Sequence, residues 1–153
     1  MKVKDVMTSE LRTCSLNTNL AVAAALMLDG DCGILPVVEE DRLFGVVTDR
    51  DLYIALATRN TRASDITVGH VVQAPVYTCS SDDDVHTALE TMKRHGVRRL
   101  PVEGYGGKVI GIVSMNDIVL ASGARKPVRD ADVVSAMQAI CAHHRADRPT
   151  AAA

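Results

Sequence analysis

Hydrophobic residues in the first part of the chain fall on one face of a helix. They stand at positions i, i+3, i+4 and i+7, a spacing that places a single apolar stripe along an α-helix. The residues of this stripe are Leu20, Ala23, Ala24 and Met27. An equivalent stripe follows 65 residues later and consists of Val85, Ala88, Leu89 and Met92. A pattern that recurs at a fixed offset indicates two copies of one structural unit.

Short apolar runs recur at nearly the same offset and predict strands. The run LPV begins at Leu35 and again at Leu100, and the run that begins at Gly45 returns at Gly111 after one inserted residue. Runs of this length between polar turns are typical of strands. We therefore expect the order β-α-β-β-α in each copy. The expected strands are those near Thr13, at 34–38, 43–47, 76–79, 99–103 and 109–113.

Capping residues set the expected helix boundaries. Asn17 or Thr18 is expected to cap the first helix of copy one, and Asp82 or Asp83 that of copy two, because short polar side chains accept hydrogen bonds from free N–H groups. The residues expected to end these helices are Gly30 and Gly96. The second helices are expected to begin at Thr48 and Ser114.

Three segments follow from this pattern: a first copy at 1–60, a second at 65–122 and a C-terminal segment at 127–153. The last segment predicts an amphipathic helix over about 130–144, followed by a frayed tail from 145 to 153. The apolar stripe of this helix consists of Val133, Met137, Ile140, Cys141 and His144.

Neither copy is large enough to bury a stable core alone, at about 60 residues. We expect the two copies to pack face to face about a pseudo-twofold axis. The predicted fold class is α/β (α+β), with a C-terminal helix and two symmetry-related clefts between the copies.

Composition narrows the function. The chain has 153 residues, of which 47% are hydrophobic, so we expect a folded protein. Its net charge of −2 offers no positive surface to bind a nucleic-acid backbone. Aromatic residues make up only 3%, so we expect no stacking surface for bases. The charged start and the shortness of every apolar run predict a cytoplasmic protein with no membrane partner. The four cysteines form no CxxC pair, and we expect no metal site.

The duplicated motifs resemble a known family. They are DVMT near the start, LPVV in the second strand and GVVTDRDL at the next strand-to-helix junction, each with a second-copy equivalent. They resemble a tandem pair of cystathionine-β-synthase (CBS) domains, the Bateman module, over about residues 1–122. The whole chain is similar to short stand-alone bacterial CBS-pair proteins of the mycobacterial hypoxic response type.

This resemblance implies a regulatory module and not an enzyme. The family binds adenosine-containing ligands such as AMP, ADP, ATP, NAD or S-adenosylmethionine, and it dimerises through the module helices. We therefore expect an adenine nucleotide as regulatory ligand in the interdomain clefts, no required cofactor, a homodimer and an unknown protein partner. The alternative is a partner-binding or structural protein whose clefts stay empty.

The strand-to-helix junctions carry the candidate site. Thr48 and Ser114 are hydroxyl residues at expected helix starts, and Asp51 and Asp117 follow three residues later. This spacing is typical of a capping box. It also suits a ligand, because a helix start attracts phosphate and a carboxylate accepts hydrogen bonds from a ribose diol. The resemblance implies that the hydroxyl contacts phosphate and the Asp contacts ribose, and the two interpretations are compatible.

Further candidates come from charge and from the family. Arg50, Arg98 and Arg99 are candidates for a phosphate tail, with exposure to solvent as the alternative. Alternate strand residues face opposite ways, so at most one of Arg98 and Arg99 should face a given cleft. The resemblance also implies that two backbone segments hold the adenine edge. These segments are formed by Thr13 and Cys14 and by Thr78 and Cys79. The alternative for both cysteines is a small buried side chain.

The C-terminal helix raises the question of a disulfide. If this helix folds back across the first copy, Cys141 can approach Cys14. Such a bond would close a very long loop and contribute about 4–5 kcal/mol in the chain-entropy model. Four reduced thiols are the alternative, because cytosolic disulfides are uncommon. Cys32 and Cys79 are expected to stay reduced.

Overall fold

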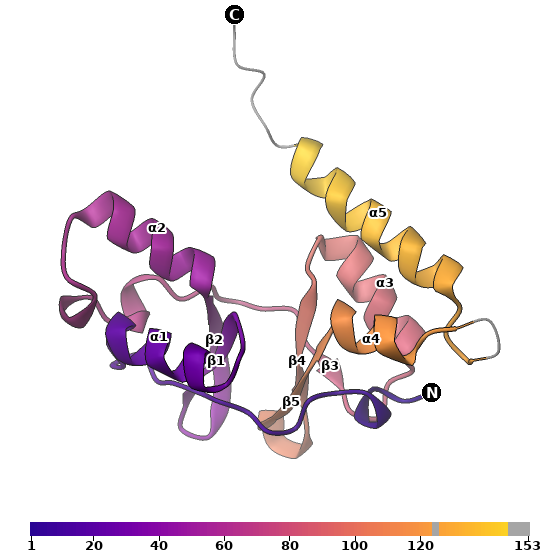
Figure 1. Cartoon of the computed structure of the whole chain (residues 1–153). Coiled ribbons are helices and arrows are strands. Elements are labelled where there is room, and N and C mark those ends of the chain that lie inside the picture. The colour runs from indigo at the N-terminus through magenta and orange to yellow at the C-terminus, as the bar shows by residue number, and fades with distance from the viewer. Residues whose placement is uncertain (124–125, 147–153) are drawn as a thin grey trace, which may run out of the picture. The chain divides into compact units, whose positions relative to one another are not determined.

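The computed structural model describes residues 1–123 and 126–146 (Figure 1). The expected tail beyond 146 lies outside the described residues. The chain forms two compact units, and each sequence repeat contributes most of one of them. The repeat-1 unit consists of Glu10–Val76 and Glu103–Ile110. The repeat-2 unit consists of Met1–Ser9, Tyr77–Val102 and the chain from Gly111 onward.

The repeat-1 unit contains two helices and a hairpin. Its elements are α1 (Leu20–Asp29), β1 (Ile34–Glu39), β2 (Arg42–Thr48) and α2 (Asp49–Arg59). β1 and β2 pair antiparallel, with Leu35 opposite Val47 and an irregularity between Val37 and Val38. The strand expected near Thr13 is reduced to one parallel bridge between Cys14 and Val37.

The second repeat follows the same order and adds the C-terminal helix. Its elements are β3 (Cys79–Ser80), α3 (Val85–His95), β4 (Arg99–Glu103), β5 (Val109–Ser114), α4 (Met115–Ala121) and α5 (Asp130–Ala146). The strands form one sheet in the order β3-β4-β5. Short 3₁₀ turns occur at Val3–Asp5 (η1), Ala63–Asp65 (η2), Val68–His70 (η3) and Tyr105–Gly107 (η4). The mixed α/β class is confirmed. The β-α-β-β-α order is complete in the second repeat, whereas the first strand of the first repeat is reduced to a bridge.

The helix caps differ slightly from the prediction. Asn19 caps α1 by accepting from the Val22 N–H, and Asp84 caps α3 by accepting from the His86 N–H. The predicted caps were one or two residues too early, because several neighbouring polar residues offer the same chemistry and only the backbone conformation selects one. The helices end at Gly30 and Gly96 as predicted.

The segment that begins each repeat packs into the unit of the other repeat. Thr8 exchanges two backbone hydrogen bonds with Ile112 in the repeat-2 unit, each with an N···O distance of 2.9 Å. Gln73, 65 residues after Thr8, forms the equivalent bridge with Val46 in the repeat-1 unit. Val3 and Val68 anchor the two segments and are fully buried. The sequence repeat and the compact unit therefore do not share their boundaries at these segments.

The predicted helix stripes form the cores. Ala24 is the exception, because it is exposed on α1. The core of the repeat-1 unit includes Leu20, Ala23, Met27, Leu35, Val37, Val47, Leu52 and Val68. The buried side chains of the repeat-2 unit include Val85, Ala88, Leu89, Met92, Leu100, Val102, Val113 and Ile118. Burial of these side chains supplies most of the stabilisation of each unit.

The C-terminal helix packs in a different rotation from the one predicted. α5 contacts α3 and α4 (Figure 1). It buries Val133, Ala136 and Ile140, whereas Cys141 is exposed and Met137 is only partly buried. The small Ala136 side chain lies on the packed face, although the hydrophobic pattern placed Met137 and Cys141 there instead. The side chain of His144 lies outside the described residues.

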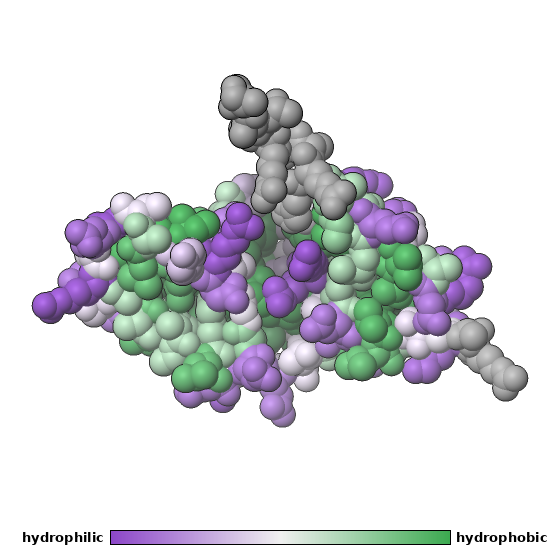
Figure 2. Space-filling model, turned by 45° about the horizontal axis from the view of Figure 1, so that its top comes forward, coloured by the Kyte–Doolittle hydropathy of each residue, from purple (hydrophilic) through white to green (hydrophobic). Residues whose placement is uncertain are grey.

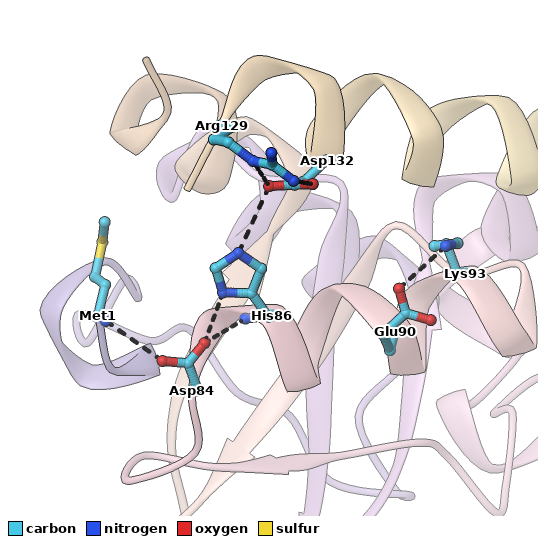
Figure 3. A network of polar contacts seen from close by, with 7 residues as sticks. All are labelled: Met1, Asp84, His86, Glu90, Lys93, Arg129 and Asp132. Carbon is cyan, nitrogen blue, oxygen red and sulfur yellow. Dashed lines mark hydrogen bonds and ion pairs between the residues drawn. The ribbon is translucent and has the colours of Figure 1, made fainter. Parts of the chain in front are cut away.

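A polar network joins the starts of α3 and α5 (Figure 3). His86 Nδ1 lies 2.8 Å from Asp84 Oδ1, and His86 Nε2 lies 3.6 Å from Asp132 Oδ2. Arg129 donates to both oxygens of Asp132. The pKa of Asp84 is lowered to about 2, chiefly because the His86 backbone N–H donates to it. The network therefore favours the ionised form of the capping carboxylate.

The segments that begin the two repeats, which we call the exchanged segments, each pack closely against a glycine at an equivalent position. A Cβ on Gly45 would lie 2.5 Å from the Gln73 carbonyl oxygen, whereas a Cβ on Gly111 would first meet the Met7 sulfur at 2.6 Å. A backbone oxygen cannot move aside as a thioether can. We expect Gly45→Ala to lower the free energy of unfolding by about 1–3 kcal/mol and Gly111→Ala by less. Urea denaturation measures both, and equal losses would contradict this account.

The Asp84 carboxylate predicts a pH-dependent stability. Its pKa in the folded protein lies below the ordinary 3.8, so its contribution is present above about pH 4 and is lost as the pH falls toward 2. Asp84→Asn keeps a capping side chain but removes the charge. We expect it to lower the free energy of unfolding by about 0.5–1 kcal/mol at pH 7, since the group is half exposed. Thermal melts should show this difference closing between pH 4 and pH 2, and a constant difference would argue against it.

Candidate functional site

The first junction is a complete capping box at the end of β2. Thr48 caps α2, and Asp51 Oδ2 accepts from the Thr48 backbone N–H at 2.8 Å and from its hydroxyl at 2.6 Å. The Asp51 N–H lies 3.3 Å from Thr48 Oγ1 and donates to it. One carboxylate oxygen is therefore committed to the helix cap, and the other is not needed for it.

The second junction repeats this geometry. Asp117 Oδ2 accepts from the Ser114 N–H at 2.8 Å and from its hydroxyl at 2.6 Å, and the Asp117 N–H donates to Ser114 Oγ at 3.3 Å. All four side chains are partly buried. The sequence predicted both boxes, because each needs only a hydroxyl residue and a carboxylate three positions later.

The two junctions differ at the second carboxylate oxygen. Gln73 Nε2 donates to Asp51 Oδ1 at 2.7 Å. Within residues 1–123 and 126–146, Asp117 Oδ1 accepts no hydrogen bond. The first junction is thus closed by a side chain from its own unit, and the second is open on that side.

Sequence reasoning missed Gln73. It stands 65 residues after Thr8 of the DVMT motif, so the repeat alignment pairs a long amide side chain with a short hydroxyl. That difference between Gln73 and Thr8 is visible in the sequence and indicates that the two repeats differ at this position. The hydrogen bond from Gln73 to Asp51 depends on the backbone bridge between Gln73 and Val46, which only the structure shows.

Charge also differs around the junctions. The Asp49 N–H donates to the Gly33 carbonyl in the repeat-1 unit, and the Met115 N–H donates to the Arg98 carbonyl in the repeat-2 unit. The acidic Asp49 beside the first junction is therefore replaced at the second by Met115, next to a basic residue. The predicted candidates Arg50, Arg98 and Arg99 are all exposed.

The two segments expected to hold the adenine edge, Thr13–Cys14 and Thr78–Cys79, differ in their burial and hydrogen bonding. The Cys14 N–H donates to the Pro36 carbonyl at 3.1 Å, and the Cys14 carbonyl accepts from Val38 at 2.8 Å. Thr13 is exposed and forms no hydrogen bond with the described residues. In the repeat-2 unit, Thr78 is partly buried and Cys79 is buried in β3.

All four cysteines are free thiols in the structure, and the suggested Cys14–Cys141 disulfide, which would join the two compact units, stays a prediction. Cys14 is buried in the core of the repeat-1 unit, where burial raises the pKa of its thiol to about 11. Cys141 is exposed on α5. The rotation of α5 that buries Ile140 leaves the Cys141 side chain exposed.

An apolar hollow of about 540 Å³ lies between α4 and α5. Its lining includes Val119, Val133, Met137 and Cys141, and it involves neither Ser114 nor Asp117. Hydrophobic residues also reach the surface elsewhere (Figure 2), among them Leu28 and Tyr53. The hollow is thus a feature separate from the junctions.

Residues 1–123 and 126–146 contain no group of three or more His, Cys, Asp or Glu side chains that could hold a metal ion. In the same residues, every helix is too short or too polar to cross a bilayer.

The sequence matches the CBS domain family over residues 3–58 and 68–124. The chain therefore belongs to this family and carries the domain twice, as the motifs predicted.

Relatives of similar length support this assignment. The uncharacterized protein YlbB of Bacillus subtilis is 37% identical over 123 residues, which cover 78% of this chain and 81% of YlbB. Hypoxic response protein 1 of Mycobacterium tuberculosis is 28% identical over 139 residues, or 90% of this chain and 92% of the relative. The predicted resemblance to proteins of that type is confirmed.

One solved structure of the family contains adenosyl ligands. The CBS domain pair of protein MJ0100, in complex with 5′-methylthioadenosine and S-adenosyl-L-methionine, is 26% identical and has a TM-score of 0.71. The match covers 78% of this chain and 94% of that one.

Thiol exposure predicts the order of alkylation. Cys141 is exposed, whereas Cys14 is buried and its raised pKa keeps it protonated at neutral pH. In the native protein we expect iodoacetamide to modify Cys141 at least about 10-fold faster than Cys14, because the Cys14 thiol is both buried and kept protonated. Peptide mass spectrometry after timed labelling measures both rates. Comparable rates, or a linked Cys14–Cys141 peptide, would contradict the structure.

Proposed function

We propose that this protein is a non-catalytic regulatory module that binds an adenosine-containing ligand at its strand-to-helix junctions. Candidate ligands are AMP, ADP, ATP, NAD and S-adenosylmethionine. The observation that carries the proposal is the duplicated capping box, in which one oxygen of Asp51 or Asp117 closes the helix and the other is not needed for the cap.

The carboxylates suit a ribose. A vicinal diol has two O–H donors, and an ionised carboxylate is an acceptor with two oxygens. Hydrogen bonds to an ionised acceptor are stronger than neutral ones. Because Oδ2 is fixed by the cap, Oδ1 is held in a defined position for a diol. Thr48 and Ser114 are the proposed hydroxyl contacts for the adjoining phosphate.

The phosphate preference is proposed to lie with the repeat-2 junction. Arg98 contributes its carbonyl to the first turn of α4, so its side chain begins near Ser114. Arg99, the next residue along the chain, is also exposed, and at most one of the two should face the junction. The repeat-1 junction instead has the acidic Asp49 at its helix start, followed by Arg50. Guanidinium groups bind phosphate through paired N–H donors.

The adenine is proposed to meet backbone groups on the strand-edge segments. Thr13 supports this role in the repeat-1 unit, since its backbone N–H and carbonyl have no partner among the described residues. Thr78 is the proposed equivalent in the second repeat. Cys14 and Cys79 then serve as buried side chains that hold the segments in place.

The adenosyl ligands of the related MJ0100 domain pair support this class of ligand. We also propose that the module acts as a homodimer in the cytoplasm and signals to a protein partner. Exposed apolar side chains on the helices, such as Leu28 and Tyr53, support self-association.

Removal of each junction charge tests the site. Asp51→Asn and Asp117→Asn keep an amide oxygen for the cap but weaken the acceptor offered to the diol. We expect each to reduce AMP affinity at its own junction by about 10- to 150-fold, the range for a lost hydrogen bond to a charged group. Isothermal titration calorimetry measures this effect.

Glu90→Gln is the matched control, because Glu90 is exposed on α3 and pairs with Lys93 of the same helix. It should leave AMP affinity unchanged, and circular dichroism should show all three variants folded. AMP binding that survives in the Asp51→Asn, Asp117→Asn double variant would overturn the site. The absence of binding by any adenosine ligand to the unsubstituted protein would favour a partner-binding role.

A further inference from the structure

Gln73 is held beside the first junction by its backbone. Its N–H donates to the Val46 carbonyl at 2.9 Å, and its carbonyl accepts from the Val46 N–H at 3.1 Å. Val46 lies two residues before the capping Thr48 on β2. This bridge fixes the start of the Gln73 side chain near the helix cap, and its amide then reaches Asp51 Oδ1 at 2.7 Å.

This hydrogen bond occupies the carboxylate oxygen that the cap leaves available. Asp51 Oδ2 already accepts from Thr48, so a diol has to approach through Oδ1. There it meets a donor that the protein itself supplies. A bond to an ionised oxygen is stronger than a neutral one, so displacing or sharing it costs binding energy.

The second repeat is an internal comparison with the same backbone and a different side chain. Thr8 bridges Ile112 in the way that Gln73 bridges Val46, and Ile112 lies two residues before the capping Ser114. The Thr8 side chain is shorter and carries a hydroxyl. It forms no hydrogen bond with Asp117 in the described structure. Side-chain length at one equivalent position therefore separates a closed junction from an open one.

We propose that Gln73 is a built-in competitor that lowers the affinity of the repeat-1 junction for ribose-containing ligands, so that the repeat-2 junction fills first. The inference rests on the proposed function, because it takes Asp51 and Asp117 as the ribose acceptors. It adds a specificity-determining residue outside the junction motif. It also makes the two sites unequal toward the ribose, independently of the arginines that favour phosphate at the second.

Exchange of the two residues tests the inference. In an Asp117→Asn background, AMP titration reports the repeat-1 junction, and we expect Gln73→Thr to raise its affinity about 3- to 10-fold, the net worth of one hydrogen bond. Gln73→Met keeps the side-chain length without a donor and should give the same gain.

The reciprocal exchange tests the repeat-2 junction. In an Asp51→Asn background, Thr8→Gln should lower the affinity of the repeat-2 junction by a similar factor. Gln138→Thr on α5 is the control and should change neither.

The outcomes separate this inference from the proposed function. AMP binding that depends on Asp51 and Asp117 but is unchanged by the exchanges at 73 and 8 overturns the role of Gln73 alone. AMP binding that is absent or independent of both carboxylates overturns the proposed function, and this inference with it. The contact between Gln73 and Asp51 can also be measured without nucleotide. The NMR chemical shifts of the Gln73 side-chain amide should change in Asp51→Asn and remain unchanged in Glu90→Gln.

Discussion

Each junction depends on one carboxylate oxygen that accepts two hydrogen bonds from the residue capping the next helix. Asp51 does this for Thr48 and Asp117 for Ser114, with the same distances in both units. The bond fixes where the hairpin ends, where the helix begins and how the carboxylate is turned. A site for a diol then needs no further residue to orient it, because the cap has already done so.

Duplication gives this chain two copies of the same cap, and their surroundings have diverged. The backbone bridges at Thr8 and Gln73 keep their equivalent places, while the side chains they carry differ in length and chemistry. Charge has diverged as well, with Asp49 at one junction and Arg98 at the other. Under the proposed function, two unequal sites would respond over a wider range of ligand concentration than two equal ones, because they would fill in sequence.

Regulation requires more than binding. A ligand shifts a protein between two arrangements only by as much as its affinity differs between them. In this chain the segment that carries Gln73 begins the second repeat but packs into the repeat-1 unit, so a change at Asp51 reaches a piece of the other repeat directly. Under the proposed function, the exchanged segments would be the physical route by which ligand at one junction affects the chain beyond it.

The amino-acid sequence by itself determined the duplication, the order of elements, the capping boxes and the family, because each is a local pattern that repeats. It did not determine the rotation of α5, which depends on Ala136 fitting against its neighbours and leaves Cys141 exposed. It placed the caps of α1 and α3 too early, since several adjacent polar residues suit a cap. It also gave no contact between Gln73 and Asp51, because the residues that meet there are 22 positions apart and are joined by an edge bridge. Such meetings depend on how distant segments pack, and only the tertiary structure decides them.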